Sequence, residues 1–145
     1  MKYMIPEQVL FIHARLIAET GGLHGVRDLA LLESAVARSQ ASFEGRDMYG
    51  DLFAKAAALL ESLVNNHPFL DGNKRTGITS VALFLQMNGY RIKTTNEEFE
   101  KFTLAVAKKQ LNFEEMTDWL AKYSKKDNGK QTDSKDHPRR HPPDL

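Results

Sequence analysis

The chain has 145 residues, 41% hydrophobic and 27% charged, so we expect one domain with a packed core rather than global disorder. Its 20 basic and 19 acidic side chains leave a net charge of +1, which gives no general argument for binding nucleic acid or membranes; any electropositive site must be local. There is no cysteine, which excludes disulfides, thiolate zinc sites and cysteine nucleophiles.

The N-terminal segment lacks the pattern of a secretory signal. Glu7, His13 and Arg15 interrupt its apolar stretch, so no continuous apolar core precedes a small-residue cleavage site. No segment of the chain approaches the roughly 20 apolar residues of a membrane-spanning helix. We therefore expect a soluble, cytoplasmic protein with no membrane partner.

The periodic apolar segments have helical spacing almost throughout. Pro6 opens the first predicted helix, which Gly21 and Gly22 end. Asp28 is the predicted N-cap of a second helix. A third helix is predicted from about residue 51 to residue 65, and its apolar character on much of its circumference predicts that it is central and buried.

The fourth helix is predicted to begin near Lys74 and to stop at Gly89, before one short extended piece over residues 90–93. Two further helices, the last ending near Tyr123, are predicted from capping signatures: Thr95 with Glu98, and Asn112 with Glu115. The sequence thus predicts an all-α fold, a bundle of about six helices with one short extended segment.

The composition changes at Ser124. Residues 124–145 contain one hydrophobic residue, Leu145, and three of the five prolines. Such a segment cannot bury enough apolar area to offset the entropy lost on ordering. We expect a folded domain over residues 1–123 and a disordered polar tail over residues 124–145.

The segment most informative about function joins the third and fourth predicted helices and has the sequence His67-Pro-Phe-Leu-Asp-Gly-Asn-Lys-Arg-Thr76. Pro68 disfavours helical geometry at His67, which places the histidine at a helix-to-loop junction where a ring nitrogen can face a cavity. Gly72 and Asn73 tolerate left-handed backbone. Turns of this kind point successive N–H groups into one concavity, here at a helix N-terminus that favours an anion.

The charged residues of this segment predict a phosphate site. Lys74 and Arg75 occupy the first turn of a helix, where each cation opposes the helix dipole by about 0.3–1 kcal/mol. A bound polyphosphate would explain both, because Arg75 binds phosphate in a fork and Lys74 adds a point charge. Asp71 suits Mg²⁺, which takes one or two carboxylates beside phosphate oxygens and waters. A neutral His67 can remove the proton of an attacking hydroxyl.

This set of groups fits phosphoryl or nucleotidyl transfer. From the residues alone, an ordinary helix connection with solvated Lys74 and Arg75 is an equally open interpretation.

Residues 67–75 match the first nine positions of the motif His-x-Phe-x-Asp/Glu-Gly-Asn-x-Arg-x-x-Arg, which defines the Fic family. Residues 21–28 and 88–90 also resemble the Doc branch of that family, and the resemblance extends over roughly residues 5–123. It implies an all-helical Fic fold with the motif loop at the mouth of a cleft. The implied roles are a general base for His67, a Mg²⁺ ligand for Asp71, and nucleotide phosphate binding for Gly72, Asn73, Lys74 and Arg75.

Two positions separate this chain from the adenylyltransferring members of the family. Lys74 stands where those members usually have glycine, and Ile78 stands where they have a second arginine. Both features resemble Doc-type enzymes, which transfer the terminal phosphate of ATP to a threonine of elongation factor Tu. The resemblance therefore implies a protein kinase that uses ATP and Mg²⁺ and blocks translation. Adenylyltransfer to a protein hydroxyl, or a non-catalytic nucleotide-binding regulatory module, are the alternatives.

Many Fic proteins carry an inhibitory Ser/Thr-x-x-x-Glu-Gly/Asn helix, and no segment of this chain matches it. The resemblance to Doc-type toxins implies that inhibition comes instead from a small antitoxin that covers the cleft. The other implied partner is the protein target, elongation factor Tu; direct contact with nucleic acid is not expected.

Several residues outside the motif have open roles. Thr79, one turn into the fourth helix, is a candidate nucleotide contact or a packing residue. His13 and His24 are expected to be packing or surface residues rather than metal ligands with His67. Arg27 and Glu33 are expected to form a structural pair rather than to line the cleft. Target contact and loop packing are equally open for two aromatic residues before the third helix, Phe43 and Tyr49.

Overall fold

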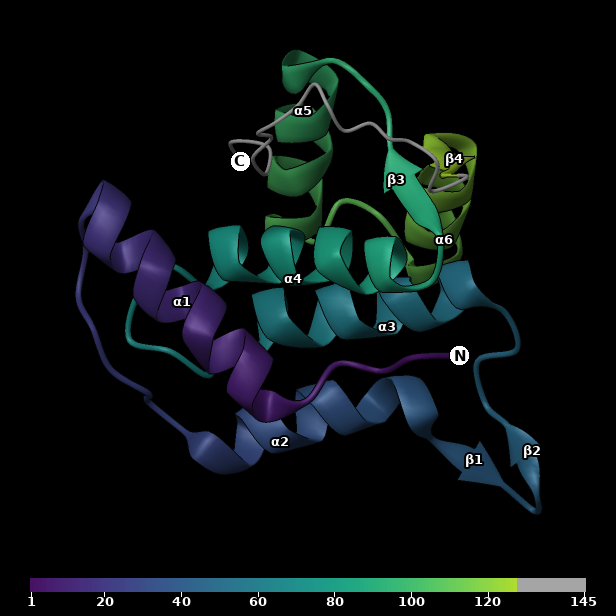
Figure 1. Ribbon diagram of the computed structural model, residues 1–145, viewed down its shortest axis with the longest axis horizontal. Helices are drawn as coiled ribbons and strands as arrows, with labels where there is room; N and C mark the ends of the chain where they lie inside the picture. Colours follow the sequence, from purple (N-terminus) through teal and green to yellow (C-terminus); the bar gives the residue numbers. More distant parts are fainter. Residues whose placement is uncertain (128–145) are drawn as a thin grey trace.

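A computed structural model of the protein describes residues 1–127 (Figure 1). Six α-helices account for most of this part of the chain: α1 Pro6–Thr20, α2 Leu29–Ala37, α3 Leu52–Asn65, α4 Asn73–Met87, α5 Asn96–Ala107 and α6 Phe113–Lys122. A 3₁₀ turn, Arg38–Gln40, follows α2. Four short strands form two antiparallel pairs, β1 Ser42–Phe43 with β2 Arg46–Asp47, and β3 Tyr90–Ile92 with β4 Ser124–Lys126. The predicted all-α fold of about six helices is confirmed.

Helix α3 forms the centre of the fold. It lies beside α4, with α2 on one side and α5 and α6 on the other, while α1 crosses α4 (Figure 1). Ala56, Ala57 and Leu60 are completely buried, as the apolar circumference of this segment predicts. Helix α4 packs closely on α3 at Gly77, where an added Cβ would lie 2.9 Å from the Val64 Cγ2 atom. This contact places the N-terminus of α4 beside the C-terminus of α3.

The helix ends follow local capping chemistry. Asp28 caps α2 by accepting a hydrogen bond from the Leu31 N–H at 3.1 Å, as the sequence predicts. Thr95 caps α5 in the same way. Asn112 and Glu115 form the reciprocal capping box predicted for α6. Side-chain caps of this kind are each worth about 1 kcal/mol. None of the helices within residues 1–127 has the length and hydropathy needed to span a membrane.

Strand β4 extends the folded domain beyond residue 123, where composition placed its end. Its register with β3 pairs Tyr90 with Lys126, Arg91 with Lys125 and Ile92 with Ser124. Backbone hydrogen bonds to β3 stabilise this strand. Because these bonds do not depend on apolar side chains, the polar composition of the segment did not predict a strand. The disorder predicted for the rest of the tail concerns residues 128–145, which lie outside the described residues.

The β1–β2 hairpin was not predicted either. Glu44 and Gly45 form its turn, both with positive φ (+52° and +80°), which is the backbone of a tight two-residue hairpin. The almost completely buried Lys55 of α3 ties the hairpin to the core. Its Nζ atom donates to Asp47 Oδ2 at 3.1 Å and to the Ser39 carbonyl at 3.3 Å. The hairpin projects at the far end of α3 from the motif loop (Figure 1).

Candidate active site

The motif loop, the C-terminus of α1 and the N-terminus of α4 enclose a cleft of about 500 Å³. Six of the seven sequence-predicted site residues line it: His67, Asp71, Gly72, Asn73, Lys74 and Arg75. The end of α1 contributes further lining residues, among them Leu16, Thr20 and Gly21. All these segments meet on one side of the molecule, at the left of Figure 1. The cleft therefore lies at a helix N-terminus, where unpaired amides and the helix dipole favour an anion.

His67 is exposed and lies immediately after α3 in a left-handed conformation, with φ at +52°. A non-glycine residue in this region carries about 1–2 kcal/mol of strain, so surrounding contacts must hold it. Arg27 supplies them, since its Nε atom donates to the His67 carbonyl at 2.6 Å and its Nη2 atom to the Asn66 carbonyl at 2.8 Å. Arg27 is thus structural, as expected, and the residue it positions is the candidate base.

Asn73 closes the loop with its side chain. Its Oδ1 atom accepts from the Phe69 N–H at 2.9 Å, and its Nδ2 atom donates to the Phe69 carbonyl at 3.0 Å. Both polar atoms of the Asn73 side chain therefore have partners within the protein. Its backbone N–H is the group that can donate to an anion. Glycine is favoured at position 72 on two grounds, because its φ is +77° and an added Cβ would lie 3.1 Å from Ile17 Cδ1, which would have to shift slightly.

The Asp71 carboxylate is fixed by backbone donors. Its Oδ2 atom accepts from the Leu23 N–H at 3.1 Å, and its Oδ1 atom accepts from the Gly72 N–H at 2.9 Å. The Gly72 N–H is therefore donated to Asp71 in this structure, and its contact with a nucleotide phosphate stays a prediction. Gly22 is equally constrained, since a Cβ there would lie 2.8 Å from Asp71 Oδ2.

His13 of α1 supports the loop from the core side. Its ring is buried and stacks on Phe69 with ring centroids 3.9 Å apart and planes 6° apart. Its Nε2 atom lies 2.8 Å from the Asp71 carbonyl oxygen. A carbonyl only accepts, so Nε2 must carry the proton and donate. His13 shares a helix face with Val9 and Ile17, both buried, a spacing that could have revealed its inward direction.

The alternative in which His13 and His24 join His67 at a metal finds no support. His13 is engaged with Phe69 and Asp71. Over residues 1–127, no three histidine, aspartate or glutamate side chains come together in an arrangement that could hold a metal.

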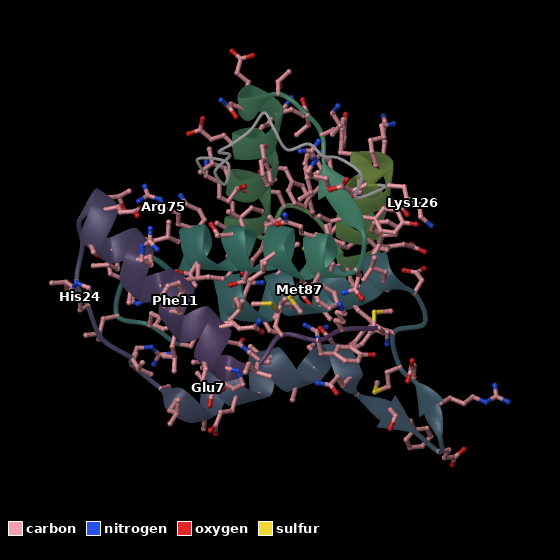
Figure 2. The ribbon with its side chains drawn as sticks, in the orientation of Figure 1. Glu7, Phe11, His24, Arg75, Met87 and Lys126 are labelled. Atoms are coloured by element: carbon pink, nitrogen blue, oxygen red, sulfur yellow. The ribbon has the colours of Figure 1, made fainter. Side chains whose placement is uncertain are left out.

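Lys74 and Arg75 are exposed in the first turn of α4, as predicted. Arg75 is positioned by α1: its Nη1 atom donates to the Thr20 hydroxyl, which in turn donates to the Leu16 carbonyl at 2.7 Å. Figure 2 shows Arg75 at the start of α4, beside α1. The guanidinium thus lies near the C-terminus of α1, where the helix dipole favours a cation. Sequence reasoning missed Thr20, because this contact joins residues 55 positions apart.

Thr79 is not among the residues that line the cleft. It is half-buried, and its hydroxyl is enclosed without a hydrogen-bond partner in the described part of the chain. Its contact with a nucleotide stays a prediction, and the geometry of the cleft lends it no support.

The chain belongs to the Fic/DOC family, whose model matches residues 3–85. It is also similar to individual members. It is 51% identical over 72 residues to the protein named Toxin Doc of Mycolicibacterium smegmatis, a match that covers 50% of this chain and 55% of that relative. It is 31% identical over 120 residues to Protein kinase doc of Escherichia phage P1, covering 83% of this chain and 94% of the phage protein. The resemblance inferred from the motif is thus confirmed at the level of the family.

Proposed function

We propose that this protein is a Doc-like toxin of a toxin–antitoxin system that acts as an ATP-dependent protein kinase. The proposed substrate is a threonine of a translation factor, elongation factor Tu, whose phosphorylation would block protein synthesis. One observation carries the proposal: His67, Asp71 and Arg75 line one cleft at the N-terminus of α4. The similarity to a relative named Protein kinase doc supports this choice of reaction.

ATP phosphates fit the N-terminal turn of α4. The first amides of a helix have no partner within it, so those of Asn73, Lys74 and Arg75 can donate hydrogen bonds to an anion there. Arg75 adds a guanidinium that Thr20 already orients, and Lys74 adds a second charge. Charge of this kind, preorganised around the phosphates, is the main protein contribution to phosphoryl transfer.

Asp71 fits a magnesium ligand. The carboxylate is exposed at the cleft, and each oxygen accepts one backbone N–H, which leaves further lone pairs for a cation. A single carboxylate beside phosphate oxygens and waters is a usual protein environment for Mg²⁺. Bound there, the ion would neutralise phosphate charge as it develops.

His67 would act as the general base. Its exposed imidazole lies at the mouth of the cleft on a backbone that Arg27 holds. In the proposed step a ring nitrogen takes the proton of the threonine hydroxyl as that oxygen bonds to the γ-phosphorus. The bond from the γ-phosphorus to the bridging oxygen breaks, and ADP leaves with that electron pair.

Adenylyltransfer is the second candidate, with attack at the α-phosphorus and loss of pyrophosphate. The burial of Ile78, which is 2% exposed, favours the kinase. Adenylyltransferring members have a second arginine at this position, whereas here α4 presents Lys74 and Arg75 to the cleft. A non-catalytic nucleotide-binding module is the third candidate.

One experiment separates the three candidates. The purified protein is incubated with elongation factor Tu and with ATP radiolabelled at either the γ or the α phosphate. We expect label on elongation factor Tu from the γ position alone. Label from the α position would indicate adenylyltransfer, and no label from either would favour a binding module. A bacterial lysate in place of the purified factor tests whether another protein is the target.

The proposed antitoxin would cover the rim of this cleft. Leu23 and Leu70 are 64% and 55% exposed, and their backbones contact Asp71 and Gly25 beside the motif. An apolar edge of this kind suits a partner that shields the site from ATP. The name of the Mycolicibacterium relative, Toxin Doc, supports a toxin–antitoxin pair.

The two aromatic residues before α3 have different surroundings in the structure. Tyr49 packs, since its ring lies 5.3 Å from that of Phe113 and its hydroxyl accepts from Arg38. Phe43 is 67% exposed on the hairpin and remains our candidate for contact with the target.

A further inference from the structure

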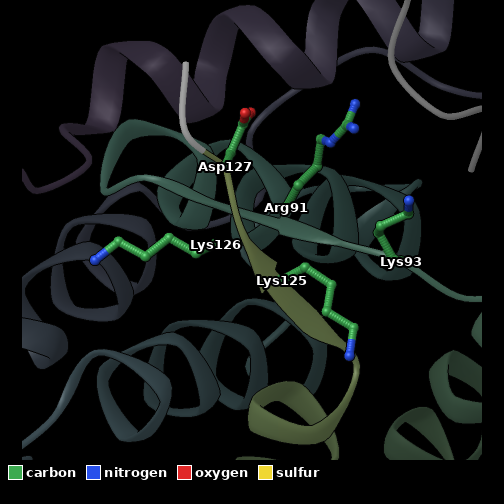
Figure 3. A pocket seen from close by; sticks show the side chains of 5 residues that line it. All are labelled: Arg91, Lys93, Lys125, Lys126 and Asp127. Atoms are coloured by element: carbon green, nitrogen blue, oxygen red, sulfur yellow. The ribbon is translucent and has the colours of Figure 1, made fainter. Parts of the chain in front are cut away.

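A second hollow, of about 380 Å³, lies over the β3–β4 pair and is lined by charged side chains only: Arg91, Lys93, Lys125, Lys126 and Asp127 (Figure 3). Figure 2 places Lys126 on the opposite side of the molecule from Arg75 of the candidate active site. The hollow is therefore separate from the cleft that the proposed function uses.

The strand pairing gathers three cations on one face. Side chains two apart on a strand share a face, so Arg91 and Lys93 do. Arg91 is paired directly with Lys125, which brings that lysine to the same face. Lys126 points the other way in Figure 3, and its Nζ atom lies 5.8 Å from the centre of the Tyr90 ring. Asp127 contributes the one carboxylate of the lining.

This arrangement is unfavourable without a ligand. Like charges directly opposite each other on paired strands are destabilising, and Arg91 faces Lys125. All three cations are exposed, and none makes a side-chain hydrogen bond or ion pair with residues 1–127. Each strand has only three residues, so repulsion between Arg91 and Lys125 weakens their pairing. An anion bound between the charges would remove this repulsion.

The lining favours phosphate over an acidic protein segment. Lysine is depleted at protein–protein interfaces, whose centres are apolar and aromatic, and this hollow has no apolar side chain in its lining. Surfaces that bind nucleic acid are polar and strongly basic, and most of their contacts are to phosphates. No aromatic or amide side chain lines the hollow to stack on a base or read its edge.

We propose that the outer face of the β3–β4 pair is a binding site for the phosphate backbone of nucleic acid, without sequence preference. The site rests on residues that neither the motif nor the proposed kinase reaction uses. It departs from the expectation of no direct nucleic-acid partner, which rested on the net charge of the whole chain. The net charge of the chain is close to zero, but the pairing of β4 with β3 brings Arg91, Lys93 and Lys125 together.

The test is binding of a fluorescently labelled single-stranded RNA of mixed sequence to the full-length protein, measured by fluorescence anisotropy between about 50 and 200 mM salt. Three contacts predict that log K falls against log salt with a slope of about −2 for a single strand. The triple variant Arg91→Gln, Lys93→Gln, Lys125→Gln should weaken binding at least about tenfold at low salt and flatten the slope.

A matched control removes the same charge elsewhere. Lys2→Gln, Arg46→Gln and Lys101→Gln alter one arginine and two lysines that are likewise exposed. This control, and the cleft variant Lys74→Gln with Arg75→Gln, should keep affinity within about twofold of the unchanged protein. Melting temperatures no lower than that of the unchanged protein establish that all three variants fold.

Three results would overturn the proposal. One is no binding of RNA by the unchanged protein at low salt. Another is equal weakening by the β3–β4 variant and either comparison variant, which would assign the binding to total charge or to the active-site cleft. The third is tighter binding of poly-glutamate than of RNA, which would identify an acidic protein segment as the occupant.

Discussion

His13 of α1 and Phe69 of the motif loop stack almost parallel, with ring centroids 3.9 Å apart. The same imidazole bonds the Asp71 carbonyl through Nε2, so one side chain holds both the apolar anchor and the proposed metal-binding residue of the loop. The position of the site thus depends on a residue of α1 that lies 58 positions before Asp71.

This relationship predicts different effects for two substitutions of His13. His13→Phe keeps the stack and loses the donor, so we expect a folded protein whose turnover falls by about 10- to 100-fold, because the loop shifts. His13→Gln keeps a donor at a similar position and should recover much of that turnover. Turnover, KM for ATP and melting temperature are measured for both. Unchanged turnover in His13→Phe would show that the hydrogen bond to Asp71 is not needed.

Removing the imidazole of His67 should abolish transfer. For His67→Ala we expect a loss of about 10²–10⁴-fold in turnover, as for other general bases, with the fold intact. His24→Ala, at another exposed histidine, is the control and should retain full activity. Transfer by the His67→Ala protein at the rate of the control would remove the central claim.

The backbone of His67 supports a separate prediction about stability. Because φ is +52° there, His67→Gly should be more stable than His67→Ala by about 1 kcal/mol. Both variants lack the imidazole and should be equally inactive. Denaturant unfolding of the two proteins measures the difference. A glycine variant no more stable than the alanine variant would show that the left-handed backbone carries no strain.

Arg75→Ala should weaken ATP binding by at least about tenfold, because a charged, bidentate phosphate contact is lost. Stability should change by less than about 1 kcal/mol, since loss of the bond to Thr20 and of the favourable position at the α1 C-terminus is offset by removal of a cation from the N-terminus of α4. Thr20→Val removes the orienting hydroxyl and should weaken ATP binding less. The effects on binding should be non-additive in the double variant, which calorimetry can measure. A clear fall in the melting temperature of Arg75→Ala would instead identify Arg75 as structural.

Two truncations test the boundary of the domain. A chain ending at residue 127 keeps β4, and we expect it to have the proposed toxicity of the full chain and to be neutralised equally by the proposed antitoxin. A chain ending at residue 123 loses the pairing of β4 with β3 and should melt at a lower temperature. Growth assays with and without the antitoxin gene, together with thermal melts, measure both. Loss of toxicity in a folded 1–127 chain would show that the tail is functional.

Local chemistry made the helices predictable, whereas pairing between distant segments did not. Asp28 and Asn112 indicate where helices begin, because the backbone N–H groups that they cap lie only three residues away. Strand β4 depends on a partner more than 30 residues earlier, and its polar side chains favour a tail. Strands of two or three residues also offer no apolar alternation to detect.

The site shows the same division. The residues of the motif were found because they are contiguous, and the structure gathers six of the predicted site residues at one cleft. Arg27 and Thr20, which position His67 and Arg75, act across 40 and 55 residues. No spacing rule connects residues that far apart. The direction of the Gly72 N–H was likewise beyond reach, because it depends on the rotamer of Asp71.

The close approach of α3 and α4 at Gly77 has a consequence for how this protein tolerates mutation. Val64, whose Cγ2 atom would lie 2.9 Å from a Cβ at position 77, also lines the cleft. A single methyl group added at position 77 would therefore push either on the wall of the cleft or on the first turns of α4. If the protein is toxic as proposed, a random screen for clones that survive its expression should return Gly77 alongside His67, although Gly77 does not line the cleft.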